Sequence, residues 1–384
     1  ASTGHAYFSM LLSACFPGNQ GRLAGMQTAL LMQWFFSGIG KIGPWFTHVN
    51  APFMLQSKIF AGQQWLFRLL VKSPTDLSPT LFGRVFAHVA ASVEYLAPMA
   101  LLASRKIRLS LPCFSKNCTT LAATSSAVEI DEKVEVTHSE HNRLTSAITW
   151  FGLTGIVGMH TYILTMPAPF DVYSWNMSFG LSAIYLFYYA SFGFDHKGAN
   201  NINRGLAGFL MSEFLLCWYG QFFPDRVGYY LSHRYWAGNW VQTLFFFKND
   251  KAVWTKLGLA KTCSDSPRVW QSLQPLSRTT WTSNMAYLWL GNLNMKAVVG
   301  LLRDSVRLAG GSSADLSDYL PIGLTQMCCG EFRDALYTLP VLPTIQEQIG
   351  FEKGECFMLR LGAFGMFQET ATWSIYDMKD GLLK

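Results

Sequence analysis

Four ionisable side chains interrupt apolar stretches of the sequence and are the first candidates for chemistry. They are His88, Glu94, His160 and Glu213. An imidazole or a carboxylate within a membrane span is unfavourable unless it faces protein or water, so such residues often serve a function. Buried His and Glu could bind a metal, relay protons, or ligate the magnesium of a chlorophyll or the iron of a haem. We therefore treat these four residues as candidate ligand-binding positions.

Their spacing argues against a metal site on any one helix. His88 and Glu94 are six residues apart, which is about 600° around a helix, or about 240°, so they do not share a stripe. A metal pair needs His or Glu at positions i and i+3 or i+4, and the apolar stretches contain no such pair. The spacing favours hydrogen bonds between helices as the ordinary role of these side chains. We assign no metal ligand and no catalytic residue.

The segment at 233–240, HRYWAGNW, is a second candidate binding region. Tyr and Trp are typical of the membrane interface, where the ring lies in the lipid boundary and its polar atom reaches water. His233 and Arg234 could receive an anionic head group there, with Trp236 and Asn239 beside them. The alternative is an aromatic belt anchored by the arginine.

Lys41 directly follows an uncharged apolar run. Its simplest role is to extend its amine from the end of a helix to the membrane surface. A desolvated lysine with a lowered pKa could instead act as a base. Asn176, near the start of another apolar run, is expected to cap a helix.

The composition indicates the class of protein that must position these residues. The 384 residues are 50% hydrophobic, 15% aromatic and only 14% charged, whereas ordinary soluble domains have about 25% charged residues. The net charge is +6, but the 30 Lys and Arg residues are scattered in ones and twos, which argues against a nucleic-acid partner. Eight cysteines without a CxxC pair are typical of free thiols. We expect a multi-pass integral membrane protein.

Five apolar runs have about the ~20 residues that a helical span requires. They are 23–40, 81–103, 147–166, 175–192 and 206–223. A sixth stretch, 53–71, contains Lys58 and Arg68, and we interpret it as interfacial or re-entrant, with a full span as the alternative. The predicted fold is mainly α, a polytopic transmembrane helix bundle of five or six spans.

Two polar regions lie outside this bundle. The stretch from Ser104 to Thr145 is too polar for lipid and is expected to be an extramembrane loop on the basic side. Residues after 247 should form a C-terminal extramembrane α+β domain on the opposite side, with a core helix in 285–303 lying on the membrane face and a β-hairpin in 354–381. The predicted divisions are 1–103, 104–146, 147–247 and 248–384.

Four segments together resemble an uncharacterised polytopic membrane family known chiefly from mycobacteria and other actinobacteria. They are QWFFSGIGKI at 33–42, FAHVAASVEYLAPMALL at 86–102, GMHTYILTMPAPFDVYSWNMSFG at 158–180 and HRYWAGNWVQTLFFFK at 233–248. The tail at 332–365 resembles the C-terminal region of that family, whereas 104–145 and part of 249–320 fall outside the match. The aromatic run ending at Lys41 is also similar to the membrane domain shared with vitamin K-dependent carboxylase-like proteins. The family has no established activity, so the resemblance implies an architecture and leaves function open.

Two functions therefore compete. The first is a non-catalytic accessory subunit of a larger membrane complex, organellar or photosynthetic, with other integral membrane proteins and membrane lipids as partners. Lipids are its expected ligands, and chlorophyll, haem or quinone are further candidates. The alternative is a membrane-embedded enzyme acting on a lipid or quinone-like substrate, which the carboxylase-like resemblance would support. Polar side chains of different helices that converge on one water-accessible cavity would favour the enzyme, whereas side chains that each bond a local partner would not.

Overall fold

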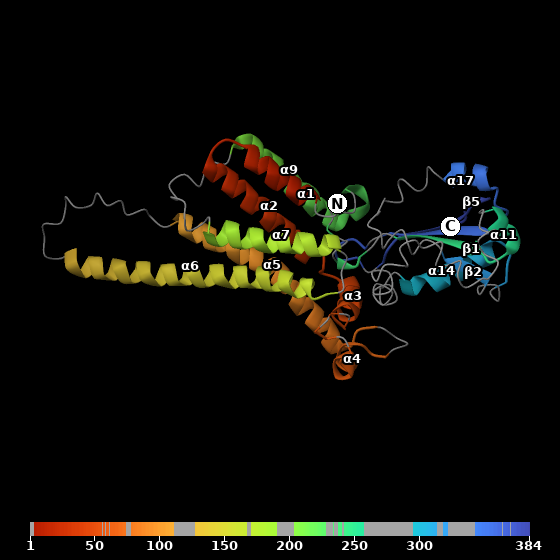
Figure 1. The fold of residues 1–384 in the computed structure, drawn as a ribbon, viewed down its shortest axis with the longest axis horizontal. Coiled ribbons are helices and arrows are strands. Elements are labelled where there is room, and N and C mark those ends of the chain that lie inside the picture. Colours follow the sequence, from red (N-terminus) through yellow and green to blue (C-terminus); the bar gives the residue numbers. More distant parts are fainter. Residues whose placement is uncertain are drawn as a thin grey trace.

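The computed structural model is mainly helical, with a small C-terminal sheet (Figure 1). It describes residues 4–55, 57, 59–60, 62–73, 78–110, 127–166, 170–189, 203–227, 233, 237–239, 242–256, 295–312, 318–321, 342–362, 364–368 and 370–384.

Six helical segments run alongside one another as a bundle (Figure 1). They are α1 (Gly4–Cys15), α2 (Asn19–Ile39), α5 (Leu81–Ser110), α6 (Ala127–Leu164), α7 (Phe170–Ile184), which continues as the π-helical turn η1 (Tyr185–Tyr189), and α9 (Arg204–Phe222). α2 contacts α1, α5 and α9, and α6 contacts α5 and α7. Each of the five apolar runs that we expected to span the membrane is therefore helical.

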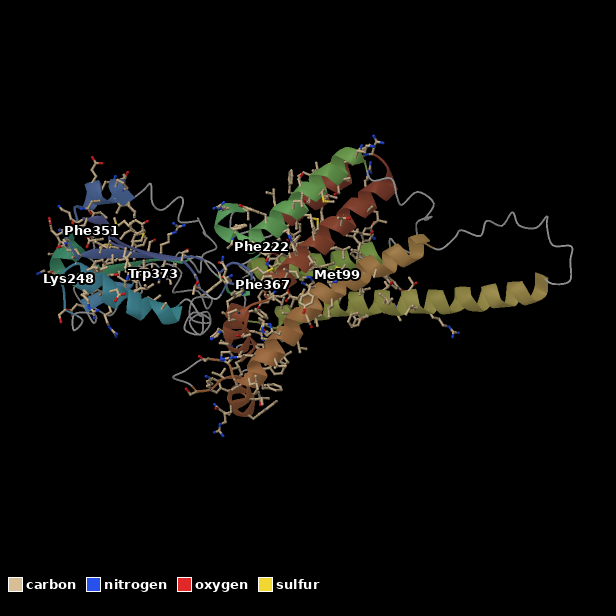
Figure 2. The ribbon with its side chains drawn as sticks, turned by 180° about the vertical axis from the view of Figure 1, so that it is seen from behind. Met99, Phe222, Lys248, Phe351, Phe367 and Trp373 are labelled. Carbon is tan, nitrogen blue, oxygen red and sulfur yellow. The ribbon has the colours of Figure 1, made fainter. Side chains whose placement is uncertain are left out.

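Two of these helices are long and apolar enough to cross a membrane, over Leu81–Ser104 and Arg143–Leu164. Only 28% of each apolar segment is buried within the protein, whereas the core helix of a soluble protein would be mostly buried. Large apolar side chains instead cover the outside of α5. They include Phe82, Phe86, Val89, Val93, Leu96 and Met99, the last of which is labelled in Figure 2. This surface suits lipid. The bundle of five or six spans stays a prediction.

The stretch 53–71 does not form one helix. α3 (Pro44–Leu55) ends in a turn, and the short α4 (Gln64–Leu70) follows it. Both lie at the end of the bundle nearest the sheet (Figure 1). The alternative of a full span through this stretch is therefore wrong.

The expected loop from Ser104 to Thr145 is largely helical, which corrects the prediction. α5 continues through Ser110 and α6 begins at Ala127. Glu, Lys and Ala residues are good helix formers, so polarity here removes lipid contact without ending the helix. The 38 residues of α6 extend over about 57 Å, well beyond a hydrocarbon core of about 30 Å. In Figure 1, α6 projects past the other helices at the end of the bundle away from the sheet. The side of the membrane that each end faces stays a prediction.

The C-terminal part forms a five-stranded antiparallel sheet in the order β2-β1-β3-β4-β5. The strands are β1 (Gln242–Lys248), β2 (Tyr319–Pro321), β3 (Cys356–Leu361), β4 (Trp373–Asp377) and β5 (Gly381–Leu382). Phe357 of β3 lies opposite Phe246 of β1 and Asp377 of β4. The hairpin predicted in 354–381 is confirmed as β3 and β4. Because β1 begins at Gln242, the sheet starts slightly before the division that we expected at residue 248.

The helices α11 (Lys251–Lys256), α14 (Met295–Leu308) and α17 (Leu342–Ile349) pack against this sheet, whereas α10 (Pro224–Val227) directly follows α9 and contacts it. α14 falls partly within the predicted core helix, of which residues 285–294 lie outside the described residues. Val298, Leu302 and Val306 lie on one side of α14 and are buried in the same core as the strands. The helix therefore packs against the sheet as a core helix, and its position on the membrane face stays a prediction.

One apolar core joins the sheet to the bundle. Trp45 of α3 stacks on Phe364, which follows β3, with ring centroids 5.7 Å apart. The same core contains Ala87 of α5 and Leu244 of β1. The loop after β3 also contacts the end of α9, where Phe222 and Phe367 mark the junction in Figure 2. The sheet is therefore anchored to the end of the bundle at which α2 and α9 terminate.

Candidate functional site

A stripe of polar residues runs along α2 inside the bundle. Gln33, Ser37 and Lys41 are spaced four residues apart, which places them above one another on one side of a helix. All three are buried, because α1, α5 and α9 pack around α2. The Gln33 amide nitrogen donates to Ser37 Oγ over 3.2 Å. This regular spacing is the sequence signal that our search for paired His and Glu residues missed.

Lys41 and Glu94 form an ion pair at the end of this stripe. The lysine amine contacts a Glu94 carboxylate oxygen and also donates to the Ser37 carbonyl over 3.3 Å. The side chains are only 8% and 12% exposed, so water screens the pair weakly. Glu94 lies near the middle of the 24-residue apolar segment of α5. The expectation that Lys41 extends to the membrane surface is wrong, because the side chain points inward to Glu94.

His160 joins three helices through both of its ring nitrogens. Trp34 Nε1 of α2 donates to His160 Nε2 over 2.9 Å, so that nitrogen must carry a lone pair. His160 Nδ1 lies 2.7 Å from the side-chain oxygen Oδ1 of Asn176 in α7, and must then carry the proton. The contacts therefore select one neutral tautomer. Asn176 lies inside α7 and is buried, so the prediction that it caps a helix is wrong.

His233 is buried beside α1 and α2, away from the membrane surface where we expected it. Its Nε2 atom lies 3.2 Å from His5 Nε2 and 3.4 Å from Gln33 Oε1. Its ring stacks on Phe36, with centroids 5.8 Å apart. At 1% exposure, the side chain cannot receive a lipid head group at the surface. Nothing in the sequence near His5 indicates this contact, because its partner lies 228 residues away.

Glu213 occupies a separate position between α1 and α9. Ser9 Oγ donates to a Glu213 carboxylate oxygen over 2.6 Å. Ser13, one turn further along α1, donates to the Ser9 carbonyl over 2.7 Å. Glu213 therefore has the local hydrogen-bond donor that a buried carboxylate requires.

Two of the remaining candidate residues, His88 and Asn239, do not join the site. His88 lies on the exposed side of α5. Asn239 forms two hydrogen bonds with the backbone of Phe364, donating over 2.7 Å and accepting over 2.8 Å, so it fastens the sheet to the bundle. Arg234 and Trp236 lie outside the described residues.

A chain of polar contacts thus connects His5 of α1, through His233, Gln33, Ser37 and Lys41, to Glu94 of α5. Among the described residues, no group of three or more His, Cys, Asp and Glu side chains is arranged to hold a metal ion. The groups that are present can hold and exchange protons.

The fold and this buried polar chain define an integral membrane protein with a helical bundle and a small antiparallel sheet domain. The chain belongs to the DUF3556 family, described as transmembrane proteins of unknown function, whose family model matches residues 1–121 and 112–384. Comparisons with curated proteins and with solved structures gave no match. The expectation of an uncharacterised membrane family is therefore confirmed.

Proposed function

We propose that the chain is a membrane-embedded enzyme in which the Lys41–Glu94 pair handles a proton of an apolar substrate. The main support for this proposal is that an ion pair lies near the middle of an apolar helix segment, where ionisable residues usually mark functional sites. The Glu94 carboxylate would accept a proton from the substrate, and the Lys41 ammonium would stabilise the substrate anion. The surroundings favour a lipid or a quinone-like molecule.

Stability alone does not account for this pair. Desolvation offsets much of the attraction between two buried charges, and replacing such a pair by apolar side chains is often neutral or stabilising. The pair also lies where α2 ends and the connection to α3 begins. A carboxylate and an amine held together in low dielectric can redistribute a proton between them, which suits acid–base catalysis.

The test compares the double variant Lys41→Met, Glu94→Gln with the wild type and with His88→Gln. Each would be returned to source cells that lack the gene, and the lipids and quinones of their membranes would be profiled by mass spectrometry. We expect the double variant to accumulate the substrate seen in the deletion strain, and His88→Gln to restore the normal profile. A normal profile with the double variant, at equal protein abundance, would assign the pair a structural role.

A second candidate function is the accessory subunit, favoured by the projection of α6. Residues 127–142 continue as helix beyond the apolar part of α6 and past the rest of the bundle (Figure 1). A single helical segment without neighbours is only marginally stable in water, so a partner protein would stabilise it. Native purification followed by mass spectrometry of co-purifying proteins tests this candidate. Recovery of the chain without any stoichiometric partner would count against it.

A further inference from the structure

Three potential metal ligands from three segments meet inside the bundle. His5 comes from the first turn of α1, Gln33 from α2, and His233 from the segment before the sheet. His233 Nε2 lies 3.2 Å from His5 Nε2 and 3.4 Å from Gln33 Oε1, and the Gln33 side chain also hydrogen-bonds His5. From this arrangement we propose that His5, His233 and Gln33 bind a divalent first-row transition metal, with Zn²⁺ as the first choice.

The distances between these ligand atoms are long for hydrogen bonds and also fit a shared metal ion. N–H hydrogen bonds in proteins are usually about 2.7–3.2 Å long, so the contact from His233 to Gln33 is longer than usual and the contact from His5 to His233 is at the upper end of this range. Bonds of about 2.0–2.2 Å to a tetrahedral zinc place neighbouring ligand atoms about 3.4 Å apart. The separations of His233 Nε2 from His5 Nε2, 3.2 Å, and from Gln33 Oε1, 3.4 Å, are therefore close to those expected for two edges of a coordination tetrahedron.

The chemistry of the ligands agrees with this geometry. Imidazole nitrogen suits zinc, copper, iron and nickel, and a carbonyl oxygen can complete such a set. The two histidine rings are nearly perpendicular, at 89°, and meet through their Nε2 atoms. Three protein ligands leave a fourth position for water or another small ligand, as in catalytic zinc sites.

The protein holds the ligands in place before any metal binds. The His233 ring stacks on Phe36, which fixes the orientation of the ring. The backbone of His233 has a φ of 55°, an uncommon conformation that the surrounding structure must hold in place. The Gln33 amide nitrogen is occupied by Ser37, which turns the amide oxygen toward the histidines. Such outer contacts orient ligands in known metal sites. Two turns of α2, about 12 Å, separate Gln33 from Lys41, so this proposal is independent of the acid–base role of the ion pair.

The experiment measures metal in the full-length protein purified in detergent without chelators. We expect about one zinc per chain by inductively coupled plasma mass spectrometry, and restoration of that zinc after stripping and titration with Zn²⁺. Co²⁺ added to the stripped protein should give the absorption bands of tetrahedral cobalt. The variants are His5→Gln and His233→Asn, the latter because asparagine tolerates a positive φ. Each should weaken Zn²⁺ binding at least tenfold.

Two controls separate loss of a ligand from loss of the fold. His88→Gln removes an exposed histidine of α5 and should bind zinc as the wild type does. His5 lies at the end of a helix, so His5→Gln should unfold at the same temperature as the wild type without metal. This variant therefore tests the proposal even if His233→Asn does not fold. Zinc binding that is equally tight in His5→Gln and in the wild type would overturn the proposal. Failure of the wild type to bind either Zn²⁺ or Co²⁺ would do the same.

Discussion

Gly38 of α2 lies directly against the α5 backbone at Glu94. A Cβ atom at position 38 would be 2.9 Å from the Glu94 carbonyl carbon and 2.8 Å from the Tyr95 nitrogen. Real Cβ atoms essentially never approach so closely, so the absent side chain allows the two helices to meet. Lys41 follows within one turn, and this close approach brings its amine to the Glu94 carboxylate. The ion pair between Lys41 and Glu94 therefore depends on a third residue, Gly38.

Replacing Gly38 by alanine should push α2 away from α5. We expect a loss of about 1–3 kcal/mol in the free energy of unfolding, because the backbone of α5 cannot rotate away as a side chain could. Unfolding in mixed micelles would measure the change. Gly158→Ala in α6 is the matched control: a Cβ at this position would meet no atom of another element within 4 Å, so the substitution should be neutral or slightly stabilising. Equal effects of the two substitutions would argue against the close contact.

Removing one member of the Lys41–Glu94 pair should be more harmful than removing both. Lys41→Met leaves a buried carboxylate without its partner, at about 3–5 kcal/mol, whereas the double variant with Glu94→Gln should recover most of that loss. Thermal unfolding of the purified single and double variants measures this coupling. If the two single losses simply add in the double variant, the two side chains do not interact.

Cys356 should resist alkylation in the folded protein. Burial raises the pKa of this β3 thiol well above its usual value, and the charges of Asp377 and Glu355 raise it further. The thiolate is the reactive form, so it stays scarce at pH 7–9. In chains that keep one cysteine, maleimide should label the exposed Cys15 quickly and Cys356 only after denaturation. Rapid labelling of native Cys356 would contradict its buried position.

The same shift predicts how the stability of the sheet depends on pH. The folded thiol keeps its proton at a pH where the unfolded thiol, with a pKa of about 8.5, releases it. The unfolded state then binds fewer protons, so the free energy of unfolding should fall as the pH rises above about 8.5. Cys356→Ala should remove this part of the alkaline loss, which chemical denaturation at pH 7, 8.5 and 10 can measure.

Asn239 should control the attachment of the sheet to the bundle. Its side chain satisfies the backbone nitrogen and oxygen of Phe364, and Asn239→Ala would leave both groups buried without those bonds. We expect a loss of about 2–4 kcal/mol and faster proteolysis near the junction of the sheet and the bundle. Asn249→Ala, at an exposed position after β1, is the control and should be cut at the wild-type rate. An unchanged cleavage rate for Asn239→Ala would show that apolar contacts alone hold the sheet.

Deleting residues 112–138 should separate insertion from assembly. The bundle should still enter the membrane, because the apolar parts of α5 and α6 are retained. If the projecting part of α6 binds a partner, the shortened chain should migrate apart from its native complex on a blue native gel. Continued migration with every native partner would make this region a passive connection.

Several features of this protein follow from its sequence alone. The low charge and the apolar runs predict a membrane protein, and helices occur at all five runs because hydropathy and helix propensity act over neighbouring residues. The hairpin of β3 and β4 was also predictable, since its two strands pair within one short stretch of apolar and polar residues and are close in sequence. The same local rules failed at Ser104–Thr145. The polarity of this stretch led us to expect a loop, but α5 and α6 continue into it as helices.

The site depended on tertiary structure. Lys41 and Glu94 are 53 residues apart, and His5 and His233 are 228 residues apart. Their contacts arise from how α1, α2 and α5 pack and from the turn that carries His233 into the bundle. A lysine at a helix end has the same local sequence whether it points to water or inward. Its direction was decided by the Gly38 contact with α5 and by the carboxylate that this contact brings within reach.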